Sequence, residues 1–118
     1  KYGYSEQASA SALSKIAEII CLIDRRLEAQ AKLDSPYLVG NTLTAADIYW
    51  ATMCMIILPA SPEIMSRTEQ NKGMLMWFES NSKTPEIANE LTKRIESHHR
   101  HILTKFCETP AVLGGHPL

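Results

Sequence analysis

The chain has 118 residues, the size of a single domain that can bury roughly two thirds of the surface its unfolded form exposes. Its composition, 45% hydrophobic with only five Gly and six Pro, argues against a disordered or fibrous protein. With a formal net charge of −1, the chain lacks the excess of basic residues that is expected of a nucleic-acid-binding protein.

The first predicted element is a helix from about Ser5 to Ala31. Apolar residues recur there every three or four positions and define one face, which comprises Leu13, Ile16, Ile20, Ile23 and Leu27. Charged residues fall mainly on the other side as a solvated face, which comprises Asp24, Arg25, Glu28 and Lys32. A coiled coil would show three or four such heptads, so this pattern favours packing against a core.

A tight turn and a helix start follow at residues 40–48. Thr44 can act as the N-cap, with its hydroxyl accepting from the Asp47 N–H, while the Asp47 carboxylate accepts from the Thr44 N–H. Leu43 and Ile48 stand at the spacing of a hydrophobic staple, and Gly40 can supply the positive φ of the turn. These residues therefore predict a structural capping box, and we assign Asp47 to it rather than to catalysis.

The helix opened by Thr44 is expected to run through Ile57 and to stop at Pro59. It is apolar nearly all round, which predicts a place at the centre of a helical bundle. Two of its aromatic residues, Tyr49 and Trp50, could line an apolar ligand pocket together with Met53, Trp77 and Phe78. Such residues at helical spacing are more often part of a core.

Three further helices are predicted. Ser61-Pro62-Glu63 has the cap, proline and acid of a helix start, and a second short helix follows Gly73. Thr84-Pro85-Glu86 repeats the signature and predicts one long final helix, whose buried stripe is Ile87, Leu91, Ile95 and Ile102. Residues 109–118 read as an irregular tail.

The cluster of His98, His99 and His101 invites a metal-binding interpretation. No Cys or carboxylate stands at a spacing that completes a tetrahedral site, and Glu90 and Arg94 have the spacing of a helical ion pair. We therefore predict no metal site and interpret the histidines as surface residues that complement the helix dipole.

No catalytic group is predicted in the chain. The sequence contains neither a G-x-S-x-G nucleophile elbow nor a glycine-rich phosphate loop. Cys21, Cys54 and Cys107 are odd in number and lack C-x-x-C spacing, so reduced thiols in the cytoplasm are expected. No stretch approaches the ~20 apolar residues of a membrane span, so we expect no membrane partner.

The string Tyr37-Leu38-Val39-Gly40-Asn41-Thr42-Leu43-Thr44-Ala45-Ala46-Asp47-Ile48-Tyr49 resembles one family. It is similar to the N-capping box and staple of the sixth helix in the all-helical C-terminal domain of cytosolic glutathione S-transferases. Family members more often carry Asp where this chain has Asn41, and either residue suits the turn. The long helix before the motif and the helices after it fit the same layout. The resemblance implies an all-α bundle of about four to five helices.

In that family glutathione is held mainly by a thioredoxin-like N-terminal domain, where a Tyr, Ser or Cys activates its thiol. The resemblance therefore implies that residues 1–118 form a single helical domain, a fragment without the thioredoxin-like domain and the first helix of the C-terminal domain. The chain would supply scaffold and part of the hydrophobic electrophile site, and it would not catalyse alone. Glutathione would be the co-substrate of the parent protein, which could be a homodimer.

Two alternatives remain open. Helical domains of this type also occur as non-catalytic interaction modules of translation factors and synthetase complexes, where exposed helix faces bind partner proteins. An unrelated helical bundle that carries a capping box by chance is the third reading.

Overall fold

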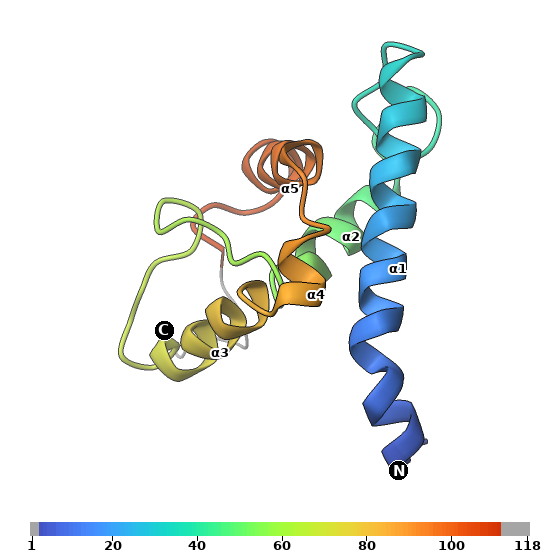
Figure 1. Cartoon of the computed structure of the whole chain (residues 1–118). Helices are drawn as coiled ribbons and strands as arrows, with labels where there is room; N and C mark the ends of the chain where they lie inside the picture. The colour runs from blue at the N-terminus through green and yellow to red at the C-terminus, as the bar shows by residue number, and fades with distance from the viewer. Residues whose placement is uncertain (1–2, 112–118) are drawn as a thin grey trace.

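The computed structural model describes residues 3–111, and every regular element among them is a helix. The helices are α1 (Glu6–Ala31), α2 (Ala45–Cys54), α3 (Lys72–Ser82), α4 (Pro85–Ala88) and α5 (Lys93–Phe106). Figure 1 shows α1 along one side of the molecule and α3 on the opposite side, with α2, α4 and α5 between them. The prediction of an all-α bundle is therefore confirmed for the described residues. None of these helices combines the length and apolarity needed to cross a membrane.

Helices α2 and α5 form the central pair and contribute to two core clusters. The α1-side core contains Ile20 and Leu27 of α1, Cys54 of α2, Ile87 of α4 and Ile95 of α5. The α3-side core is built mainly from buried residues of α2, α3 and α5 and from Met55, which directly follows α2; the helix residues are Ala51, Leu75, Phe78, Ile102 and Leu103. Ile56 packs against both clusters, so the two cores are continuous across the end of α2.

The predicted face of α1 is confirmed over its second half and fades toward the N-terminus. Ile20 and Leu27 are buried, Ile16 and Ile23 are half-buried, and Leu13 is exposed. The N-terminal half of α1 extends away from the other helices in Figure 1. Its small and polar residues therefore meet solvent rather than a core.

Helix α2 ends earlier than the sequence predicts. After Cys54 the backbone bonds join residues three apart instead of four. Ile57 N–H donates to Cys54 O at 2.9 Å, and Ile56 N–H donates to Met53 O at 3.2 Å. Pro59 has no N–H to continue the helix, and its ring would clash with the carbonyl one turn earlier. The chain therefore leaves α2 through a tight turn ahead of the proline.

The helix predicted from Ser61 is a single turn. Ser61 O accepts from Ile64 N–H and Met65 N–H, each at 2.9 Å, and the helical hydrogen bonds of this segment end at Met65. The adjacent residues Ile64 and Met65 of this turn are both buried. Arg67 donates to Met65 O at 2.9 Å, so that carbonyl is bound by a side chain instead of a following turn.

The predicted final helix is two helices with a break at residues 89–92. Thr92 caps α5, because its Oγ1 accepts from Ile95 N–H at 3.3 Å and donates to Asp24 Oδ1 of α1 at 2.6 Å. Arg94 donates to both Asp24 oxygens at 2.9 Å, so the predicted Glu90–Arg94 pair is wrong. Asp24 is therefore not part of a solvated face: it fixes the start of α5 against α1.

Part of the predicted tail lies within the described residues. Thr109 and Pro110 are in no helix, and Ala111 N–H donates to Ile64 O at 2.6 Å. This bond ties the segment after α5 to the turn that follows α2. Residues 112–118 of the predicted tail lie outside the described residues.

Candidate functional site

Asp47 lies in the first turn of α2 with no solvent exposure. Its Oδ2 accepts from the Thr44 N–H at 3.0 Å and from the Thr44 hydroxyl at 3.3 Å. The Thr44 hydroxyl also faces the Asp47 N–H, but that N–H donates to the Thr44 carbonyl at 3.1 Å. The carboxylate half of the capping box is therefore the stronger half.

The turn before the box has the predicted backbone. Gly40 adopts a φ of 62°, in the left-handed region that glycine enters without steric cost. Leu43 and Ile48, the two residues of the predicted staple, are half-buried and both pack against the α3-side core. The entry of the chain into α2 is thus held by apolar contacts as well as by the cap.

The second oxygen of Asp47 joins two segments that are distant in sequence. Oδ1 accepts from the Leu38 N–H at 2.8 Å and lies 2.9 Å from Nε2 of His98 on α5. One buried carboxylate therefore connects the loop before α2, the cap of α2 and the middle of α5. The spacing of the box reveals the local part of this arrangement, and the contact with His98 is not encoded locally.

The hydrogen bonds of Asp47 fix its charge. Burial alone would raise the pKa of this carboxyl, but the bonds from Leu38, His98 and Thr44, with the charge of His98, outweigh burial and lower it. Asp47 is therefore ionised at neutral pH and can only accept hydrogen bonds. It follows that Nε2 of His98 carries the proton it donates to Asp47.

Helix α1 binds the loop of residues 35–40 from its other side. Arg26 Nε donates to the Leu38 carbonyl at 2.7 Å, and Gln30 Nε2 donates to the carbonyls of Tyr37, at 2.9 Å, and of Gly40. Because Gln30 is 3% exposed, these bonds are shielded from water. The loop is thereby held between α1 and Asp47.

The prediction of surface histidines is wrong for His98 and His99, which are 5% and 4% exposed. They share the buried face of α5 with Ile95, Ile102 and Leu103. This spacing of three and four residues is the sequence signal that could have placed them in the core. His101 is half-buried next to them.

His99 is held neutral by its surroundings. Burial and repulsion by His98 lower its pKa to about 4, although a hydrogen bond to the Ala51 backbone acts in the opposite direction. Within the described residues, three buried imidazole nitrogens have no hydrogen-bond partner: Nδ1 of His98, Nε2 of His99 and Nε2 of His101. No group of three or more His, Cys, Asp or Glu side chains in residues 3–111 could hold a metal ion.

The aromatic and methionine residues considered for a ligand pocket separate into a buried group and an exposed group. Phe78 is buried in the α3-side core and Trp50 is half-buried against the α1-side core. Tyr49 and Met53 are 70% and 64% exposed on α2, and Trp77 is 57% exposed on α3. The expectation of an interior α2 therefore fails on the face formed by Tyr49 and Met53.

The cysteines offer no reactive thiol at the box. Cys54 is buried in the α1-side core, and burial raises its pKa to about 12. Cys21 and Cys107 are free and half-buried. The bonds that Asp47 makes give it a structural role, since it holds the Leu38 and Thr44 N–H groups and the His98 ring.

Replacing Asp47 with Ala is expected to lower the free energy of unfolding by about 3–5 kcal/mol, because the buried Leu38 N–H, the half-buried Thr44 N–H and the His98 ring lose their acceptor. Thr44→Ala is the matched control, since it removes only the weaker half of the box and should cost about 1 kcal/mol. Urea denaturation measures both values. Equal losses in the two variants would contradict the role assigned to the carboxylate.

The stability of the protein is expected to fall as the pH drops from 6.5 toward 4. The pKa of His99 is near 6.5 in the unfolded chain and about 4 in the fold, so in this window only the unfolded state takes up the proton. The contribution of neutral His99 to the free energy of unfolding is complete above pH 6.5, and about 2 kcal/mol of it is lost between pH 7 and pH 5. Urea denaturation at the two pH values measures this loss.

His99→Gln is expected to reduce that loss, because glutamine does not titrate. His101→Gln alters the half-buried neighbour on the same helix and serves as the control. This variant should lose more stability between pH 7 and pH 5 than His99→Gln does. Asp47 does not contribute in this window, since its lowered pKa confines the loss of its stabilisation to pH values below about 4. An unchanged pH dependence in His99→Gln would refute the assignment.

Comparisons with known proteins leave the family of this chain open. No protein-family model, no curated protein and no solved structure matches it. The resemblance carried by residues 37–49 is therefore the observation from which a function has to be proposed.

Proposed function

We propose that this chain belongs to the helical C-terminal domain of a cytoplasmic protein of the glutathione S-transferase type. The observation that carries the proposal is the capped start of α2, where Thr44 and Asp47 follow a glycine turn and Leu43 precedes the cap. The long α1 before this motif and the helices after it support the same assignment.

In such a protein the thioredoxin-like domain binds glutathione, lowers the pKa of its thiol and directs the thiolate to an electrophile. The chain described here contributes the packed helices and one wall of the apolar electrophile site. None of its residues acts on the thiol. A homodimer is compatible with this function, and no nucleic acid or membrane takes part in it.

The exposed face of α2 is the best candidate for that apolar wall. Tyr49 and Met53 are one helical turn apart, and both side chains are mostly exposed. Large apolar side chains that share one exposed face often mark a surface that binds a ligand or another domain. We assign this face to contact with the electrophile at the junction with the glutathione-binding domain.

A second candidate function is that of a non-catalytic interaction module. It is favoured by the exposed Met76 and Trp77 on α3, because solvent-exposed Trp is enriched among residues that anchor protein interfaces. The two functions differ in one observable. Only the transferase requires a thioredoxin-like domain with a thiol-activating Tyr, Ser or Cys in the same reading frame.

The test begins with the coding sequence that adjoins the codon of Lys1. We expect it to encode a thioredoxin-like domain, and the protein made from the complete frame should conjugate glutathione to a chloronitrobenzene. The 118-residue chain alone should show no conjugation. A complete frame without such a domain, or turnover by the isolated chain, would overturn the proposal.

Variants of the complete protein test the assigned wall. Tyr49→Ser with Met53→Ser should raise the KM for the electrophile by roughly three- to tenfold and leave the KM for glutathione unchanged, because only apolar contact is lost. Met76→Ser with Trp77→Ser is the matched control, with residues on α3 that are also more than half exposed. If the α3 pair alone changes the kinetics, the wall is wrongly placed.

A further inference from the structure

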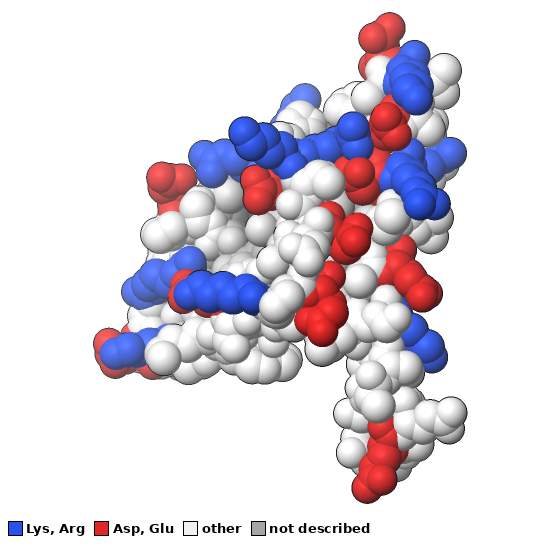
Figure 2. All heavy atoms as spheres, in the orientation of Figure 1, with Lys and Arg blue, Asp and Glu red and all other residues white. Residues whose placement is uncertain are grey.

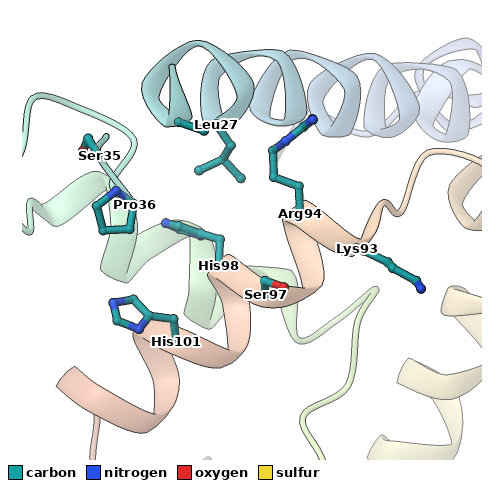
Figure 3. Close-up of a pocket in the computed structure, with 9 residues that line it drawn as sticks. Leu27, Ser35, Pro36, Lys93, Arg94, Ser97, His98 and His101 are labelled. Atoms are coloured by element: carbon teal, nitrogen blue, oxygen red, sulfur yellow. The ribbon is translucent and has the colours of Figure 1, made fainter. Parts of the chain in front are cut away.

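A cavity of about 500 Å³ lies between the C-terminal end of α1, the loop of residues 35–40 and α5. This volume is within the range of sites that bind small molecules. Figure 3 shows His98 and His101 projecting from α5 toward Pro36, with Leu27 of α1 above them. The cavity is distinct from the exposed face of α2 assigned above, and the proposed function does not use it.

Hydrogen bonds made outside the cavity hold its three walls in place. Gln30 of α1 donates to two carbonyls of the loop. On α5, the ring of His98 is fixed by its contact with Asp47, 2.9 Å away. Arg94 of α5 binds both oxygens of Asp24 on α1 at 2.9 Å. The cavity is therefore preformed, and a ligand does not have to order its walls.

The polar side chains on the inner surface of the cavity are already bonded or inaccessible. The Ser35 hydroxyl donates to Gly40 O at 2.6 Å and accepts from Tyr37 N–H at 3.2 Å. Nε2 of His98 is taken by its carboxylate partner, and Nδ1 of the same ring has almost no accessible surface. Nε2 of His101 is equally inaccessible. These side chains therefore offer a ligand mainly carbon surface.

The cations that line the cavity, Lys93 and Arg94, are exposed at its rim. Arg94 turns toward α1, where Asp24 neutralises it. Lys93 points away from the rings of His98 and Pro36 in Figure 3, and Figure 2 shows that the Lys and Arg side chains over α5 face solvent. No Asp or Glu among residues 3–111 lines the cavity. A charged ligand group would thus lose water there without gaining a buried partner.

The carbon surface of the cavity suits a flat ring. Leu27 is buried and forms the floor, and the exposed Ala31 and Pro36 form apolar walls. The rings of His98 and His101 complete the lining from α5. A planar ring packs well against other rings, and a rigid ligand loses little conformational freedom on binding.

We propose that the cavity binds a small uncharged aromatic molecule, with its ring between Pro36 and the imidazole of His101 and its edge toward Leu27 and Ala31. Binding is driven by the removal of apolar surface from water. No ion pair and no change of protonation takes part in it. The chain would then have a ligand site of its own in addition to the electrophile surface assigned to α2.

Toluene is the probe, and the methyl signals of Leu27 and Ala31 in the ¹³C-labelled full chain are the readout. We expect saturable shifts, since a bound aromatic ring perturbs nearby methyl groups, with a Kd of about 1 mM. Benzoate and protonated benzylamine carry the same ring with a charge, and each should bind at least about threefold more weakly. Absence of a saturable shift, or a charged ring that binds as tightly as toluene, would overturn the proposal.

A cavity-filling variant tests the location of the site. Ala31→Phe places a ring of the protein in the space assigned to the ligand and should weaken toluene binding by about tenfold or more. Ala29→Phe is the matched control, because Ala29 is also exposed on α1 but does not line the cavity. The methyl signals of Leu27 report on both variants. Equal affinity in the two variants would place the site elsewhere. The comparison of toluene with the charged rings in the unaltered chain decides the ligand class even if a variant fails to fold.

Discussion

The buried carboxylate of Asp47 is the interaction on which the arrangement of the molecule depends. It accepts from backbone N–H groups of Leu38 and Thr44 and from the ring of His98, and so joins a loop, the start of α2 and the middle of α5. A buried charge is tolerated only when its hydrogen bonds are satisfied, so these three segments must pack against one another in the folded state. The central pair of helices is specified in this way by a polar contact as well as by apolar packing.

The same contact shapes the surfaces that can bind other molecules. Because His98 commits Nε2 to Asp47, its ring is held at the position where α5 borders the cavity between α1 and α5. Asp24 acts in a comparable way at the other end of α5, where it binds Thr92 and Arg94 and closes that side against α1. The exposed Tyr49 and Met53 lie on α2 outside these networks and are free to contact a ligand or a second domain.

Local signals in the sequence predicted the local structure well. The spacing of Thr44 and Asp47 indicated the cap, Gly40 the turn, and the apolar period of α1 its buried face. The contacts of Asp47 with His98 and of Asp24 with Arg94 span 51 and 70 residues, so no local pattern reveals them. The start signal at Thr84-Pro85-Glu86 predicts one continuous helix and so masks the second cap at Thr92. The apolar spacing around His98 was outweighed by the solvated character that clustered histidines usually have.

A double-mutant cycle on Asp47→Asn and His98→Gln tests the central claim most directly. Free energies of unfolding from urea denaturation at pH 7 give the coupling between the two side chains. The structure predicts a coupling of about 2 kcal/mol or more, as expected for a desolvated, charge-assisted hydrogen bond. A coupling below about 0.5 kcal/mol, with the two single losses simply adding, would contradict it.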